Sequence, residues 1–145
     1  GASVVRVFCP ETCHCHDPSS PLALPYPRTG CPRACLSLSS YTSALAKRPC
    51  RDIPKHELVS NSSWMAFTNN YMIATSSWGR YVVAYQSIAQ TMAVHGCDAV
   101  NIVRTNLSMD ICVPFNVKSV QLFCPISCAC ESLGPSDFKQ CPTQC

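Results

Sequence analysis

Cysteine content restricts what this chain can fold into more than any other feature of its sequence. Thirteen of the 145 residues are cysteine, close to the composition of disulfide scaffolds. Only 13% of the residues are charged, which is the reverse of the pattern in disordered chains. Because thiols do not persist as disulfides in a reducing cytosol, the sequence predicts an extracytoplasmic protein whose fold is held by covalent bridges.

The cysteines belong to an internal repeat. Residues 5–15 (VRVFCPETCHC) match residues 120–130 (VQLFCPISCAC), and a second element follows each copy, at 31–35 (CPRAC) and 141–145 (CPTQC). The shared pattern is F-C-P-x-[ST]-C-x-C, a spacer, and then C-P-x-x-C, in which five cysteines and two prolines match in order. Two explanations stay open: a window on a tandem array with a period of about 110–115 residues, or one domain with two similar ends.

Counting the cysteines limits how they pair. Each copy holds five, so each needs a partner from the three others, and one cysteine of the chain is then left over. We expect Cys112 to bond the second copy and Cys50 to bond the first, which leaves Cys97 unpaired or bonded to another chain. The candidate disulfide residues are Cys9, Cys13, Cys15, Cys31, Cys35, Cys50, Cys97, Cys112, Cys124, Cys128, Cys130, Cys141 and Cys145.

The middle of the chain has a different character. Residues 51–96 contain no cysteine, and apolar residues at helical spacing predict helices within 62–73 and 80–95, the second ending at Gly96. A shorter helix is expected over residues 40–48. The cysteine-free segment is therefore expected to supply the conventional hydrophobic core.

The two ends are expected to be richer in loops. Residues 4–8 and 117–123 carry β-branched and aromatic side chains, which favour a short strand before each cysteine cluster. The sequence thus predicts a small disulfide-rich α+β fold with a helical middle and two similar cysteine-rich ends. We divide the chain into residues 1–50 (first repeat copy, N-terminally incomplete), 51–96 (helical core) and 97–145 (second copy), packed as one folded unit.

The sequence also bears on metal binding and catalysis. Residues 13–16 read Cys-His-Cys-His, as zinc ligands could, but the second copy has Ala129 and Glu131 in place of the histidines. The chain has no Cys-x-x-Cys pair, nucleophile elbow or phosphate-binding loop. We therefore expect no metal, no cofactor and no enzymatic activity.

Charge and hydropathy exclude two further classes. The net charge is +3 without a dense basic stripe, which argues against nucleic-acid binding, and no apolar run is long enough to span a membrane. No signal peptide is recognised, so an exported protein would be present here as a mature or trimmed chain. Asn61 and Asn106 begin N-x-S sequons and are glycosylation candidates if the chain passes through a secretory route.

Two known families resemble parts of the repeat. Phe8 to Cys15, Gly30 to Cys35 and Phe123 to Cys130 resemble cysteine-rich repeats of exported dinoflagellate proteins, which read F-C-P-x-[ST]-C-G-C and then G-C-P-x-x-C. His14 and Ala129 stand where that pattern has glycine. The first element alone also resembles the tail of sea-anemone-toxin-like (ShK-type) domains. The first resemblance implies export and lineage, and neither implies an activity.

We expect a non-enzymatic structural or protein-binding module, stiffened by disulfides, in an extracytoplasmic matrix, filament or cell-surface assembly. One alternative is an accessory lumenal subunit of a photosynthetic membrane complex, and a second is a secreted toxin-like or inhibitor-like protein. The expected location is secreted or cell-surface, or else an organelle lumen such as the thylakoid lumen. The expected partners are other proteins, including copies of this chain or a larger membrane complex.

Overall fold

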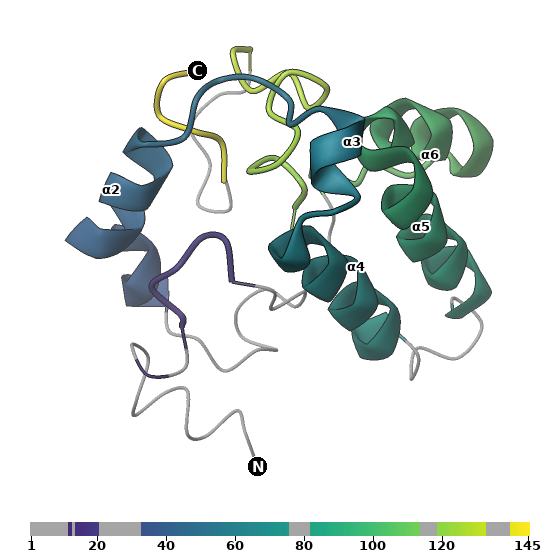
Figure 1. Ribbon diagram of the computed structural model, residues 1–145, viewed down its shortest axis with the longest axis horizontal. Helices are drawn as coiled ribbons and strands as arrows, with labels where there is room; N and C mark the ends of the chain where they lie inside the picture. The colour runs from purple at the N-terminus through teal and green to yellow at the C-terminus, as the bar shows by residue number, and fades with distance from the viewer. Residues whose placement is uncertain (1–11, 13, 21–32, 76–81, 114–118, 133–139) are drawn as a thin grey trace.

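The computed structural model describes residues 12, 14–20, 33–75, 82–113, 119–132 and 140–145 (Figure 1). These residues form helices and turns, and no strand occurs among them. Within this part of the chain, no helix has both the length and the apolar character that crossing a bilayer requires. The helical elements in chain order are η1 (Arg33–Ser37), α2 (Ser39–Ala46), α3 (Lys55–Leu58), α4 (Ser62–Thr75), α5 (Val82–His95), η3 (Gly96–Asp98) and α6 (Ala99–Leu107).

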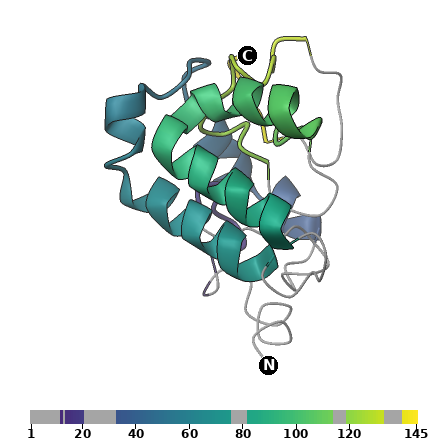
Figure 2. The ribbon, with the colours of Figure 1, turned by 90° about the vertical axis from the view of Figure 1, so that its right-hand side faces the viewer.

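The helices lie on two sides of the molecule. Helix α5 packs between α4 and α6, and these three helices form a layer in the foreground of Figure 2. Helix α2 lies on the opposite side, beside the C-terminal residues (Figure 1). The turns of residues 119–132 lie between α2 and the three-helix layer. The fold is therefore a helical layer joined to a separate helix through a segment without regular secondary structure.

Local signals explain where the main helices begin and end. The Trp64 N–H donates to Asn61 Oδ1 at 3.0 Å, which makes Asn61 the N-cap of α4. Helix α5 ends before Gly96, whose φ of +59° is readily adopted only by glycine. A Cβ atom at Gly96 would lie 3.3 Å from Leu58 Cδ2, so glycine also permits α3 to approach closely.

The predicted helices are confirmed, and two were missed. Helices α2, α4 and α5 lie where the segments 40–48, 62–73 and 80–95 predicted them. Helices α3 and α6 were not predicted. Helix α3 has only four residues, and α6 is short and rich in β-branched residues, which lower intrinsic helix propensity. Burial of Val100 and Val103 against the core stabilises α6 in spite of that propensity.

The predicted strand at residues 117–123 is wrong for its described part. Residues 119–123 curl into turns, in which the N–H groups of Phe123 and Cys124 donate to the Val120 carbonyl at 2.9 and 3.0 Å. Curling buries Val120, Leu122 and Phe123 together, whereas a strand would send neighbouring side chains to opposite faces. The strand expected at residues 4–8 lies outside the described residues. The α+β class is thus replaced by helices and turns, and the small disulfide-rich fold is confirmed.

The hydrophobic core is shared between the helical middle and the C-terminal turns. The ring of Phe123 meets Trp64 edge-on with centroids 5.0 Å apart, and it lies 5.8 Å from Phe67. Tyr71 extends the aromatic cluster along α4. Tyr41 of α2 joins the same buried cluster. Residues 51–96 therefore supply only part of the core, contrary to the expectation from the sequence.

Removing the Asn61 cap should destabilise the protein without altering its fold. Asn61→Ala leaves the Trp64 N–H without its side-chain acceptor, and we expect the free energy of unfolding to fall by about 1 kcal/mol. Asn61→Asp should retain most of the stability, because a carboxylate also caps a helix. The measurement is denaturant unfolding of unglycosylated protein with its disulfides intact. Asn106→Ala, at the exposed second sequon, is the matched control, and equal losses from both alanine variants would contradict the cap.

Candidate functional site

Disulfides concentrate in the C-terminal cystine segment, by which we mean residues 119–132 and 140–145. Every cysteine between residues 36 and 145 is in a bridge, with Cα–Cα distances of 5.0 to 5.6 Å, within the usual range. The bridges are Cys50–Cys145, Cys97–Cys124, Cys112–Cys128 and Cys130–Cys141. Three of the four join this segment to the rest of the chain.

The pairing differs from the expected one at two cysteines. Cys112 bonds the second copy as expected, through Cys128. The expectation for Cys97 is wrong, because the buried turn before Cys124 brings Cys124 against η3, where Cys97 lies. The expectation for Cys50 is also wrong, since Cys50 bonds Cys145 and not the first copy.

The first copy is described only in part. Cys15 is disulfide-bonded and buried, and its partner lies outside the described residues. Cys35 is also buried. Cys9, Cys13 and Cys31 lie outside the described residues. Since the eight cysteines of residues 36–145 pair among themselves, at least one of the five cysteines of the first copy has no disulfide partner in this chain.

The two copies share an unusual backbone turn. His14 has φ of +58° and Ala129, at the matching position, has φ of +53°. The N–H of Asp17 donates to the His14 carbonyl at 3.2 Å, and that of Ser132 to the Ala129 carbonyl at 3.0 Å. A positive φ is sterically costly for residues with a Cβ atom, so glycine would adopt this turn more readily than His14 or Ala129.

Asp52 holds the first turn of the cystine segment. Its Oδ1 accepts the N–H groups of Ile126 at 2.8 Å and Ser127 at 3.1 Å, and its Oδ2 accepts the Ser127 hydroxyl at 2.5 Å. The Ile53 N–H donates to the Phe123 carbonyl at 3.1 Å, which extends the contact. In the second copy, the serine of the F-C-P-x-[ST]-C pattern is thus a hydrogen-bond donor to a carboxylate distant in the sequence.

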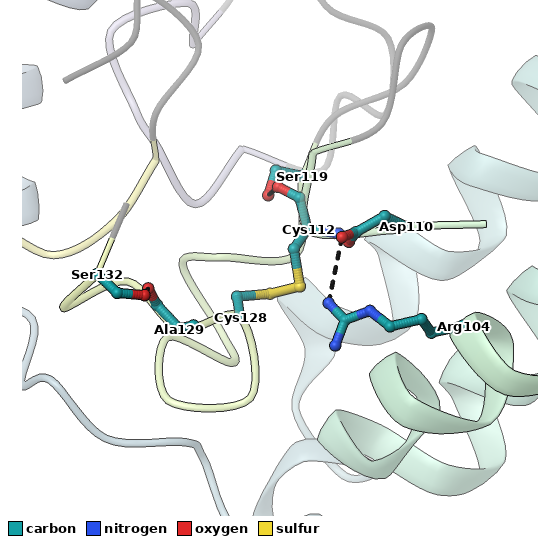
Figure 3. Close-up of polar contacts among 7 residues, drawn as sticks. All are labelled: Arg104, Asp110, Cys112, Ser119, Cys128, Ala129 and Ser132. Atoms are coloured by element: carbon teal, nitrogen blue, oxygen red, sulfur yellow. Dashed lines mark hydrogen bonds and ion pairs between the residues drawn. A yellow bond between two sulfur atoms is a disulfide. The ribbon is translucent and has the colours of Figure 1, made fainter. Parts of the chain in front are cut away.

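Figure 3 shows a second connection, between the end of α6 and the same segment. Arg104 Nη2 lies 3.2 Å from Asp110 Oδ2, and Asp110 Oδ1 accepts the Cys112 N–H at 2.8 Å. The Ser119 hydroxyl donates to the Cys112 carbonyl at 2.6 Å, and Cys112 bonds Cys128. The exposed ion pair contributes little energy by itself. Asp110 links the side chain of Arg104 on α6 to the backbone of Cys112.

One hollow in the described part of the surface is small for a ligand site. Residues 52–55 line it together with His95, Cys97 and Asp98, and its volume is about 190 Å³. Ligand pockets usually measure roughly 300–1,000 Å³. No group of three or more His, Cys, Asp or Glu residues among the described ones is placed to hold a metal ion.

The histidines and the sequons occupy separate parts of the surface. The rings of His14 and His16 are 6.1 Å apart, with His14 exposed. Asn61 is half-buried at the start of α4, and Asn106 is exposed in the last turn of α6. Glycosylation of either asparagine stays a prediction.

The chain matches no family model, and neither a curated protein nor a solved structure is significantly similar to it. The structure itself therefore sets the class. It is a small, largely helical protein stabilised by disulfides, which is consistent with an extracytoplasmic location.

Loss of the Asp52 carboxylate should loosen the cystine segment. Asp52→Ala removes an acceptor of two N–H groups and one hydroxyl, and we expect unfolding to become easier by about 2 kcal/mol. Denaturant unfolding under oxidising conditions measures this loss. Glu131→Ala, an exposed carboxylate in the same segment, should change stability by less than about 0.5 kcal/mol. Equal effects of both substitutions would show that Asp52 does not hold the turn.

Two buried tyrosines should ionise late as the pH rises. Burial raises the pKa of Tyr41 to about 12, helped by the charge of Asp17, and burial also raises the pKa of Tyr71 well above 10. Their protonated forms are favoured by folding, so this stability is complete below about pH 10 and is lost as pH rises through 12. Absorbance at 295 nm after a rapid pH jump should show a late phase accompanied by unfolding. Tyr41→Phe should reduce that phase by one phenol, and a single transition near pH 10 would contradict the burial.

Proposed function

We propose that this protein is a non-enzymatic structural or protein-binding module in a larger extracytoplasmic assembly, with disulfides fixing its shape. The observation that carries the proposal is the bonding of every cysteine from residue 36 to 145 into four bridges, three of which hold a turn-only segment to the helices. Such bonding favours a fixed surface. A surface ordered before binding loses less conformational entropy when a partner docks.

The outward faces of the helical layer support a role in protein contacts. Met65 and Ile73, eight residues apart on α4, are 57% and 59% exposed, and spacing of this kind places them on one helix face. Val83 and Val94 of α5 are 76% and 59% exposed. Exposed apolar side chains are common singly, so these faces support a binding role without defining a partner.

Bridge length gives a test of the rigid-scaffold mechanism. In the chain-entropy account, closing a longer loop restricts the unfolded chain more. Replacing Cys50 and Cys145, 95 residues apart, with serine should therefore cost about 2 kcal/mol more than replacing Cys130 and Cys141, which are 11 apart. Denaturant unfolding of the two double variants provides the comparison.

Complete reduction of the disulfides should unfold the protein, because the combined loss of stability exceeds the free energy of unfolding of an ordinary domain. A reduced chain with unchanged circular dichroism would contradict the mechanism.

The role itself requires the native protein. Gentle purification with non-cleavable and cleavable crosslinkers should recover it in a complex of defined stoichiometry with other proteins or with copies of itself. Recovery as a monomer after crosslinking would argue against an assembly role. A chlorophyll-protein complex as the constant neighbour would instead favour the lumenal accessory subunit.

A further inference from the structure

The disulfides of residues 36–145 form a closed set. Its eight cysteines make four bridges, and Cys50 near its start bonds Cys145 at its end. The Gln144 amide donates to the Ala46 carbonyl at 2.8 Å, so residues 141–145 lie against the end of α2 (Figure 1). No cysteine of residues 36–145 is therefore left to form a disulfide with a cysteine of the first copy.

The first copy of the repeat corresponds to the C-terminal part of residues 36–145. The positive φ values of His14 and Ala129, 115 positions apart, and the hydrogen bonds that follow them give both copies the same turn. In the second copy only Cys130–Cys141 is internal, and the matching pair in the first copy is Cys15 with Cys31. Cys15 is disulfide-bonded, as this correspondence requires.

The other cysteines of the first copy correspond to cysteines that bond outside the second copy, and residues 36–145 contain no cysteine left to bond them. Cys124 and Cys128 bond Cys97 and Cys112, which flank α6. Their counterparts are Cys9 and Cys13, and these would need a second pair of cysteines placed like Cys97 and Cys112.

The hydrogen bonds of Asp52 also involve only the second copy among the described residues. Asp52 binds the Ser127 hydroxyl, and the matching residue of the first copy is Thr12, which is exposed. The Thr12 hydroxyl would therefore donate the same hydrogen bond to the counterpart of Asp52 in another unit.

We propose that residues 36–145 form one unit in which every cysteine pairs within the unit. Residues 1–35 would form the C-terminal part of a second unit of the same kind, joined in tandem before the first. The partner is thus a further copy of this unit, which presents its own counterparts of Cys97, Cys112 and Asp52 to the first copy. This inference names a partner for the structural role proposed above. Only the biological purpose of the tandem arrangement rests on that role, because the disulfides can be mapped independently of it.

Neighbouring units would also touch without a covalent bond. In the first copy Cys15, Pro18 and Ser20 are buried, and Asp17 lies close enough to Tyr41 of α2 for its charge to act on the phenol. The end of one unit would therefore lie near the first helix of the next.

The bridges of the chain as it stands give the first test. Non-reducing digestion and mass spectrometry should recover the four bridges of residues 36–145 and a peptide pair joined by Cys15 and Cys31. Any bridge in more than trace yield between residues 1–35 and residues 36–145 would overturn the closed unit.

A fusion tests the tandem partner. A copy of residues 36–119 is placed directly before Val5, so that Val5 takes the position of Val120 in the added unit. The three added cysteines bring the total to sixteen, and we expect eight bridges and no free thiol, with Cys9 bonded to the added copy's Cys97 and Cys13 to its Cys112. The unfused chain, with an odd number of cysteines, must retain at least one thiol per molecule that no intrachain bridge uses.

Matched variants of the fusion decide between pairing and chance oxidation. Cys97→Ser in the added copy should release one thiol per molecule, located at Cys9, while Ser108→Ala in that copy should release none. Bridges that ignore the added cysteines would overturn the tandem arrangement. Correct bridges in a native protein that joins no assembly would leave the tandem unit standing and reject the proposed role.

Discussion

The contact on which the rest of this structure depends is the attachment of the Phe123–Cys124 turn to the helical layer. Phe123 enters the aromatic cluster of Trp64 and Phe67, and the next residue is bonded to Cys97 in η3, which follows α5. The segment around it has turns in place of helices or strands, so few backbone hydrogen bonds could hold it there alone. The disulfide restricts the conformations that the unfolded chain can adopt around Cys124. Burial of the Phe123 ring then favours the observed position of the turn against the helices.

Polar contacts then set the direction of the chain on either side of that attachment. Asp52 binds the backbone after Cys124, and Asp110 binds the backbone at Cys112. Each carboxylate satisfies N–H groups that a helix or sheet would otherwise pair. Disulfides, an aromatic anchor and two carboxylates together do what regular secondary structure does in larger domains. Rigidity without a large core suits a module whose use is to hold a surface in place.

Sequence reasoning succeeded where the signal was local. Helical spacing located α4 and α5, and Gly96 marked the end of α5, because periodicity and capping act over a few neighbouring residues. It failed for residues 119–123, whose β-branched and aromatic side chains favour a strand until burial of Val120 and Phe123 together requires a turn. It also missed α6, whose stability comes from packing against α5.

The sequence by itself determined that the chain would depend on disulfides, that its middle would be helical, and that at least one of its 13 cysteines would lack a disulfide partner in the chain. Only the tertiary structure decided which cysteines meet. Cys97 finds Cys124, and Cys50 finds Cys145 across 95 residues, because helix packing and the turn at Phe123 bring their Cα atoms to within 5.3 and 5.0 Å. A bridge requires proximity in space, and for residues far apart in the chain no local pattern encodes that proximity.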